Sequence, residues 1–290
     1  MRHFELIEPR SFADACAALA TEAGSRPVAG GTALLTIIRQ GLLRPQKLVN
    51  LQKIRDGSAI TFAAQAGMRI GALTTIHAIE TSSLVRQHYP ILAEACHAVA
   101  NIRIRNMATL GGNLAHGDYQ SDPPTVLAVL NAKVELTTKH GIREMGLSEF
   151  QRGSYDTALE TGELLTAILI PPLRPGFTGV YLKFTTGSAG ERPCAGLAAL
   201  ARMEDGICRE LRLGVGAVSQ RPLRIAAAED QACDKALDHE LIESMAAEAA
   251  RAVDPIEDVR GSADYKRRLV QVLARRAITA ALSDACEATP

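Results

Sequence analysis

Two short segments of this sequence are built around paired glycines, a pattern that can bind a ligand through the backbone. The first reads Ala29, Gly30, Gly31 and Thr32, and the second, about 80 residues later, reads Thr109, Leu110, Gly111, Gly112 and Asn113. A glycine pair lets the backbone adopt positive φ and leaves no Cβ between its amides and an incoming group. Successive exposed N–H groups then form a concavity that binds anions such as a pyrophosphate. The hydroxyl and amide side chains beside the glycines would add further donors.

Each glycine pair also has an ordinary alternative, because glycine pairs are common in tight turns that bind nothing. Neither segment fits the GxGxxG pattern of a Rossmann fold or the GxxxxGK[ST] pattern of a Walker loop. The residues therefore disfavour those two nucleotide-binding folds. They leave open whether each segment, taken alone, is a binding loop or a turn.

The elements around the two segments indicate a small β-α-β subdomain followed by short strands and helices. In the first 55 residues we expect strands at 4–7, 26–29 and 48–51, a helix whose apolar stripe runs from Phe12 to Leu19, and a helix or extended segment at 34–41. From residue 60 to 170 we expect strands at 60–63, 68–71, 133–138 and 163–170, helices beginning at Thr74, after Pro90 and after Pro123, and a loop at 109–113. Both glycine segments would thus connect ordered elements.

A connector rich in proline and glycine, Leu173–Phe177, marks the expected domain boundary. Beyond it the pattern predicts strands at 179–185, 195–203 and 207–218, followed by helices at 236–253 and 263–282. We expect an antiparallel sheet with helices on one face. The predicted domains are 1–55 and 56–174, two halves of one domain, and 178–287.

The composition excludes several classes of protein. Lys plus Arg and Asp plus Glu each number 32 among 290 residues, so no net charge attracts the chain to nucleic acid or to an anionic membrane. The longest apolar runs are too short to span a bilayer, and the N-terminus lacks a secretory h-region. We therefore expect a cytoplasmic protein.

The cysteines argue against a metal or cluster held by sulfur. They are Cys16, Cys96, Cys194, Cys208, Cys233 and Cys286. No two of them have the spacing of a CxxC pair or of an iron–sulfur run. His116 and Asp118 alone are too few ligands for a metal site, so we expect none.

In context, the two glycine segments resemble the paired pyrophosphate loops of the FAD-binding medium subunits of molybdenum hydroxylases, such as carbon monoxide and xanthine dehydrogenases. The likeness extends along the chain and is strongest at Ile104–His116, which is similar nearly residue for residue. Tyr155–Pro171 and Asp258–Arg276 resemble the family's domain-closing segment and C-terminal helix. The resemblance implies an α+β fold with a two-part FAD-binding domain of the vanillyl-alcohol oxidase-like (PCMH) type. A smaller α/β C-terminal domain with an antiparallel sheet would follow.

The resemblance also implies roles for individual residues. Ala29, Gly30, Gly31, Thr32 and Ala33 would wrap the FAD pyrophosphate together with Thr109, Leu110, Gly111, Gly112 and Asn113. Asp122 would bind the ribityl or adenosine part, Leu165 would pack on a ring, and Lys183 would lie near the flavin. A cation there would stabilise charge on the reduced flavin, by up to about 4 kcal/mol at 4 Å and an effective dielectric of about 20.

Several of these residues have simpler alternatives. Asp122 precedes two prolines and could be a helix N-cap, and Lys183 could be a solvated lysine on a surface strand. Leu165 could be a core leucine. The family often has His or Asp where this chain has Thr32, which keeps a donor.

For the complex, the resemblance implies a small subunit with [2Fe–2S] clusters and a large molybdopterin subunit, as a dimer of heterotrimers. Electrons would pass from a cluster through FAD to an external acceptor, with no catalytic residue in this chain. The substrate, bound elsewhere, and the acceptor are not specified by this sequence. The alternative function is a self-contained vanillyl-alcohol oxidase-type FAD oxidoreductase, and a non-catalytic nucleotide-binding module is a second alternative.

Overall fold

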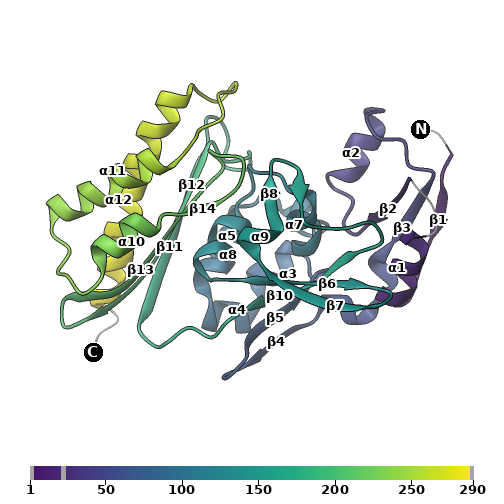
Figure 1. Cartoon of the computed structure of the whole chain (residues 1–290), viewed down its shortest axis with the longest axis horizontal. Coiled ribbons are helices and arrows are strands. Elements are labelled where there is room, and N and C mark those ends of the chain that lie inside the picture. Colours follow the sequence, from purple (N-terminus) through teal and green to yellow (C-terminus); the bar gives the residue numbers. More distant parts are fainter. Residues whose placement is uncertain (1–2, 21–23, 288–290) are drawn as a thin grey trace. The chain divides into compact units, whose positions relative to one another are not determined.

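The computed structural model describes residues 3–20 and 24–287, and the chain forms two compact units (Figure 1). The first comprises Met1–Ile79, Asn101–Gly117 and Ala132–Pro171, and the second comprises Glu80–Ala100, Asp118–Asn131 and Pro172–Pro290. Two mid-chain segments thus belong to the same unit as the C-terminal residues. The predicted domain limits, which assumed continuous segments, stay predictions.

The first unit begins with a small parallel sheet. Its strands are β1 (Glu5–Ile7), β3 (Lys47–Asn50) and β2 (Ser25–Val28), in that order. Parallel neighbours need a crossover connection, and α1 (Phe12–Ala20) lies between β1 and β2 in the sequence, with Ala15, Cys16 and Leu19 buried. The predicted β-α-β subdomain is confirmed. The first glycine segment follows β2 directly and leads into α2 (Leu34–Arg39).

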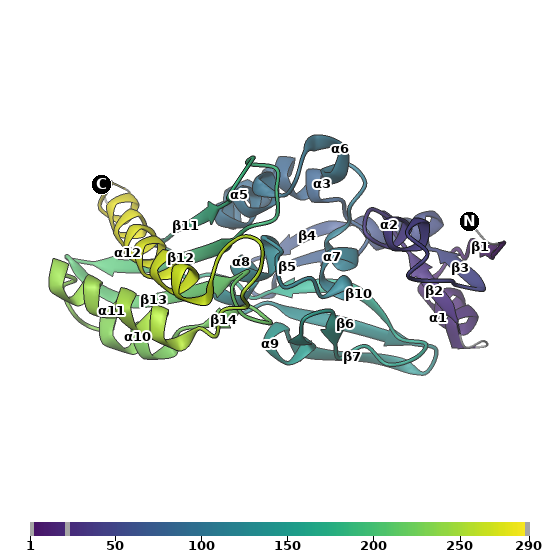
Figure 2. The ribbon, with the colours of Figure 1, turned by 90° about the horizontal axis from the view of Figure 1, so that it is seen from above.

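A five-stranded antiparallel sheet forms the rest of the first unit (Figure 2). Its order is β4 (Ile60–Ala63), β5 (Gly67–Gly71), β10 (Leu164–Ile170), β6 (Lys133–Thr138) and β7 (Gly141–Gly146). The central strand β10 is buried at every residue except Leu169, as expected for a strand covered on both faces. The smaller elements are η1 (Leu51–Lys53), η2 (Arg55–Ser58), α6 (Ile102–Arg105), α7 (Leu110–His116), α9 (Leu147–Phe150), β8 (Gln151–Gly153) and β9 (Asp156–Thr157), while α3 (Ile76–Thr81) spans the limit between the units.

The second unit contains a four-stranded antiparallel sheet in sequence order. Its strands are β11 (Phe177–Phe184), β12 (Ala195–Glu204), β13 (Ile207–Gly216) and β14 (Leu223–Arg224). The helices that follow are α10 (Ala226–Ala232), α11 (His239–Ala252) and α12 (Ala263–Glu287). The three predicted strands and two predicted helices are confirmed, and β14 and α10 are additional.

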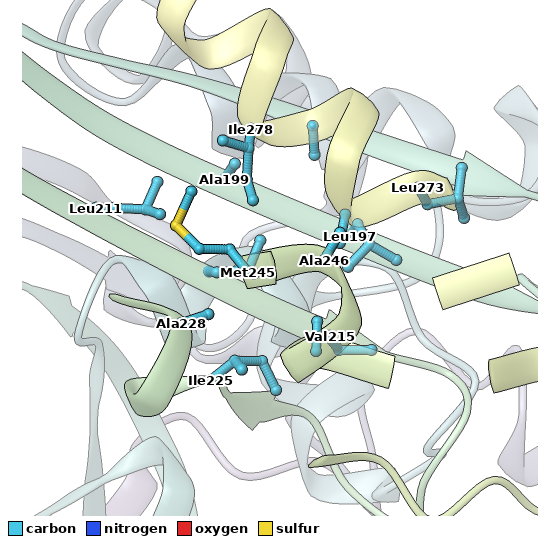
Figure 3. Packing of buried hydrophobic residues seen from close by; sticks show 14 of the residues in the cluster. Leu197, Ala199, Leu211, Val215, Ile225, Ala228, Met245, Ala246, Leu273 and Ile278 are labelled. Carbon is cyan, nitrogen blue, oxygen red and sulfur yellow. The ribbon is translucent and has the colours of Figure 1, made fainter. Parts of the chain in front are cut away.

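The helices of the C-terminal region cover one face of this sheet, as predicted, and helices from the middle of the chain, which the prediction did not place here, cover the other. Alternate side chains of a strand point to opposite faces. Leu197, Leu211 and Val215 belong to the core that the sheet forms with α10, α11 and α12 (Figure 3). On the other face, α5 (Pro90–Ala98) packs against β11 and α8 (Pro123–Val129) packs against β12 and β13. These two helices, with α4 (Ser83–His88), come from the mid-chain segments.

The glycines of β13 let α8 approach closely. A Cβ on Gly216 would lie 1.9 Å from Thr125 Oγ1, and one on Gly214 would lie 2.8 Å from Val129 Cγ1. Both contacts are too short for a side chain, so the sheet needs glycine where this helix crosses it. Separately, no helix within the described ranges is both long and apolar enough to cross a membrane.

Candidate functional site

The first glycine segment presents backbone donors that the protein itself does not use. Gly31 has φ of +71°, a conformation that glycine adopts without steric cost. Within the described part of the chain, the N–H groups of residues 30–33 donate no hydrogen bond to a protein acceptor. The segment is fixed instead through its carbonyls, since Gln52 Nε2 donates to Ala29 O at 3.0 Å and Leu35 N–H donates to Gly31 O at 3.0 Å. Four successive amides at the start of α2 are therefore available to an anion.

The second glycine segment is the first turn of helix α7 rather than a loop, which corrects the prediction for 109–113. Thr109 is the N-cap and its Oγ1 accepts the Gly112 N–H at 3.1 Å. The N–H groups of Leu110, Gly111 and Asn113 donate to Thr74 O, Ala72 O and Thr109 O, at 2.9–3.0 Å. All four amides thus have protein acceptors, so this segment does not form the expected nest of free N–H groups. Among its side-chain donors is the hydroxyl hydrogen of Thr109.

Two of the glycines are required by contacts within the protein. A Cβ on Gly30 would lie 1.8 Å from Met107 O, so the first segment touches the backbone that precedes the second. A Cβ on Gly111 would lie 2.4 Å from Ala72 Cβ and 2.7 Å from Ala72 O. These glycines bring the two segments together and seat α7 on the residue after β5. By contrast, a Cβ on Gly112 would meet only Thr109 Oγ1 within 3 Å.

The two segments line one cavity of about 600 Å³ within the first unit, a volume typical of small-molecule sites. Every predicted residue of both segments lines it except Leu110, which is buried. Leu165, on β10, lines it as well, so its side chain is not only a core residue. Sequence reasoning missed further lining residues, among them Arg26, Ile37, Leu42, Leu43, His116, Tyr155, Leu159 and Glu163. Most of the cavity wall is apolar.

An ion pair between the exposed Arg143 and the buried Glu163 adjoins this cavity. Arg143 Nε and Nη2 donate to the two carboxylate oxygens of Glu163 at 2.7 and 2.8 Å, and the Glu160 N–H adds a third bond at 3.1 Å. Burial opposes ionisation of Glu163, but the hydrogen bonds from Arg143 and from the Glu160 N–H, together with the charge of Arg143, hold the pKa of this carboxyl below its ordinary value. Glu163 is therefore a carboxylate beside the cavity, and Arg143 already neutralises its negative charge.

In the second unit the structure brings Asp122 and Lys183 together. Lys183 Nζ lies 3.1 Å from Asp122 Oδ2 and also donates to Ala98 O at 2.7 Å. Tyr181 donates its hydroxyl to Asp122 Oδ1 at 2.8 Å. Burial raises the pKa of Asp122 to about 6, although Lys183 and Tyr181 act to lower it. Burial, together with the neighbouring carboxylate, raises the pKa of Tyr181 well above its ordinary range.

This arrangement rules out the two simpler alternatives for Asp122 and Lys183. Asp122 occupies the N-cap position of α8, but its carboxylate makes no capping bond and turns to β11 instead. The Lys183 side chain is 9% exposed, so it is not a solvated lysine. Both residues lie in the second unit, whereas the eleven other predicted site residues lie in the first.

The remaining sequence candidates have ordinary partners. His116 packs its ring against Tyr155 and Asp118 pairs with Arg192 at 2.9 Å. Cys194 is fully buried, its Sγ lies 3.7 Å from Arg260 O, and burial raises the pKa of its thiol. A raised pKa disfavours the reactive thiolate. The residues that fit a dinucleotide are therefore those of the first unit: amides without acceptors at 30–33, a free hydroxyl hydrogen on Thr109, and an apolar wall.

Comparisons with known proteins identify the family of the chain. Residues 2–173 match the family described as FAD binding domain in molybdopterin dehydrogenase, and residues 182–281 match the CO dehydrogenase flavoprotein C-terminal domain. The carbon monoxide dehydrogenase medium chain of Afipia carboxidovorans is 36% identical, over 95% of both chains. The nicotine 6-hydroxylase medium subunit of Paenarthrobacter nicotinovorans is 34% identical, over 94% of this chain and 95% of that one.

A solved structure gives the same result. The carbon monoxide dehydrogenase of Hydrogenophaga pseudoflava, in a form that lacks the Mo-pyranopterin moiety of its cofactor, contains a chain that matches with a TM-score of 0.94 and 30% identity. The match covers 97% of this chain and 98% of the other. The implied α+β fold is confirmed. The chain therefore belongs to the family of FAD-binding medium subunits of molybdenum hydroxylases.

Proposed function

We propose that this chain is the electron-transferring flavoprotein subunit of a cytoplasmic molybdenum hydroxylase and that it holds FAD in the cavity of the first unit. Its partners would be a small [2Fe–2S] subunit and a large molybdopterin subunit, assembled as a dimer of heterotrimers. The observation that carries the proposal is the row of backbone amides at 30–33 without acceptors at the wall of a cavity of cofactor size. Full-length similarity to named medium chains supports it.

The two glycine segments would bind the diphosphate in different ways. The amides of Gly30, Gly31, Thr32 and Ala33 would donate to its oxygens, helped by the N-terminal end of the α2 dipole. Thr109 would donate its hydroxyl hydrogen, while Leu110, Gly111 and Gly112 would supply a close backbone wall, and Asn113 a polar lining. Leu165 would pack its apolar side chain against a ring of the cofactor.

Asp122 and Lys183 would act as a pair. Because Asp122 already neutralises Lys183 at 3.1 Å, the field of the lysine at a nearby flavin would be smaller than that of an unpaired cation. Removing Lys183 should still lower the flavin reduction potential if the cofactor is nearby. Lys183→Met with an unchanged potential in the flavin-loaded complex would exclude this role.

When bound, FAD would supply the ability to accept electrons singly and to deliver them one or two at a time. The chain's own residues would bind it, orient it and limit its contact with water. None of them needs to act as an acid or base on the hydroxylated substrate. The similar medium subunits belong to enzymes named for different substrates, a carbon monoxide dehydrogenase and a nicotine 6-hydroxylase. This is consistent with a substrate that binds to another chain of the complex.

Co-purification tests the proposal against a self-contained flavoenzyme. An affinity-tagged chain expressed from its native locus should bring down two further proteins, one containing iron and acid-labile sulfide and one containing molybdenum. The complex should carry one FAD per medium chain and have the mass of six chains. A flavin-free complex would refute the FAD site. A tagged chain that purifies alone, contains flavin and oxidises a substrate would favour the oxidase alternative.

A further inference from the structure

Tyr155 is a cavity-lining residue that the diphosphate site does not use. It lies in the turn between β8 and β9 and lines the same cavity as the two glycine segments. The residue is 54% exposed, although its ring is large and mostly apolar. Its backbone has φ of +57°.

The position of Tyr155 is fixed by the end of α7. Its N–H donates to Gly117 O at 2.7 Å, and Gly117 is the left-handed residue, φ +67°, that ends the helix. A Cβ on Gly117 would lie 3.2 Å from the Tyr155 Cα, so the two backbones are in contact. The His116 ring, which also lines the cavity, lies edge-on to the Tyr155 ring with centroids 5.1 Å apart. The C-terminal end of α7, whose N-cap is Thr109, therefore orients the Tyr155 ring.

The fold alone does not account for a tyrosine here. Left-handed backbone is uncommon for a bulky residue, and Asn or Gly adopts it at lower cost. An exposed ring also leaves apolar surface in water, which is unfavourable unless a ligand covers it. Residues held in costly conformations cluster at binding sites, where the surrounding structure maintains them. A ligand that covers the ring would explain both the residue type and its exposure.

We propose that Tyr155, oriented by His116, is the stacking platform for a flat heteroaromatic ring of the dinucleotide bound in this cavity. The inference rests on the proposed FAD site and adds a recognition element to it. FAD carries two such rings, the adenine and the isoalloxazine, and both have the π-face that an aromatic side chain stacks on. Tyr155 is thus assigned to binding a ring and the glycine segments to binding the diphosphate.

The test uses three variants of the complete chain in its complex, after reversible removal of flavin. Tyr155→Asn removes the ring but suits the left-handed backbone, Tyr155→Phe keeps the ring, and Tyr265→Asn removes a comparably exposed tyrosine from α12. We expect FAD to bind at least roughly tenfold more weakly to Tyr155→Asn. Tyr155→Phe and Tyr265→Asn should bind FAD with nearly wild-type affinity. The melting temperature of flavin-free Tyr155→Asn should equal or exceed that of the wild type, because backbone strain is relieved.

Affinity and stability together separate binding from folding. Weaker FAD binding with an unchanged or raised melting temperature supports the stacking role. Equal FAD affinity in Tyr155→Asn and wild type overturns it, as does a loss of affinity that Tyr155→Phe shares. If the wild-type complex itself binds no FAD, the proposed function fails, which is a different result from failure of Tyr155 alone.

Two further measurements identify the ring. Tyrosine in contact with an isoalloxazine quenches its emission by electron transfer and phenylalanine does so poorly, so Tyr155→Phe should brighten bound FAD if the flavin ring stacks. If adenine stacks, emission stays constant and ADP competes with FAD less well in Tyr155→Asn than in the wild type. Constant emission together with unchanged competition by ADP would count against the stacking platform.

Discussion

Gly30 and Met107 are in backbone contact, with the Met107 carbonyl oxygen 1.8 Å from where a Cβ on Gly30 would lie. This contact joins the segment that carries the free amides to the chain that leads into α7. The geometry of the anion site therefore depends on the packing of Gly30 as well as on its amide. Substitutions can separate this structural requirement from direct binding.

Gly30→Ala should impair both folding and FAD binding. The methyl group cannot be accommodated without moving Met107 away, so we expect about 1–3 kcal/mol lower stability of the flavin-free chain. FAD content should fall because the two segments separate. Thermal unfolding and flavin content per chain measure the two effects. Gly141→Ala is the matched control, since a Cβ at that glycine meets nothing within 4 Å.

Gly111→Val and Gly112→Val should differ, although the sequence treats the two glycines alike. At Gly111 a Cβ collides with the Ala72 backbone, so valine should destabilise the flavin-free chain by several kcal/mol, about 3 or more. At Gly112 the only close atom is Thr109 Oγ1, so stability should fall by only about 1 kcal/mol, through the N-cap. Both variants should lose FAD. Urea unfolding of the flavin-free proteins distinguishes them, and equal losses of stability would contradict the assignment.

Lys183→Met should destabilise the chain in a manner that depends on pH. The lysine holds down the pKa of Asp122, which burial raises to about 6. Without Lys183 this pKa rises further, and the stability that protonation provides is lost as pH increases through it. We expect a loss of about 3–5 kcal/mol near pH 8 and a smaller loss near pH 5. Adding Asp122→Asn should recover part of it, and pH-independent destabilisation would show that the pair is not coupled as described.

Glu163→Gln should change the pH dependence of stability in the opposite direction from Lys183→Met. The folded-state pKa of Glu163 is lower than its ordinary value, so its contribution is present above about pH 4.5 and is lost as pH falls through the folded pKa. The variant should be about 1–3 kcal/mol less stable at neutral pH, because Arg143 loses a charged acceptor. Its stability should decline less between pH 5 and about pH 3 than that of the wild type. Parallel pH curves of melting temperature would refute this.

Regular patterns in the sequence predicted most of the fold correctly. Apolar runs separated by turn residues marked the long strands β12 and β13 of the second unit, and the apolar stripe of α12 marked that helix. Strand β7 was missed because all six of its residues are partly or fully exposed, so it lacks a buried face that would produce alternation. The helix at Leu110 was missed because a glycine pair disfavours helix. It forms because Thr109 caps it and Ala72 and Thr74 accept its first amides.

The site was only partly predictable for a related reason. The glycine segments could be found because their chemistry lies within five consecutive residues. The link between Asp122 and Lys183 spans 61 positions, and nothing in the sequence relates them before folding. Tyr155 has no local signal, since its left-handed backbone and its contact with His116 exist only in the folded chain.

Two helices of the second unit, α5 and α8, come from the middle of the chain, which affects how this unit folds during synthesis. Helices α5 and α8 leave the ribosome before the sheet that they cover. Ile91 and Val129, which are buried in the folded protein beside Gly179 and Gly214, therefore stay exposed until β11–β13 have been made. A nascent chain halted after residue 171 would present these apolar surfaces to chaperones and proteases. Premature termination in the C-terminal region would therefore also disable residues encoded far upstream, and such truncated chains should be degraded rather than accumulate as free FAD-binding fragments.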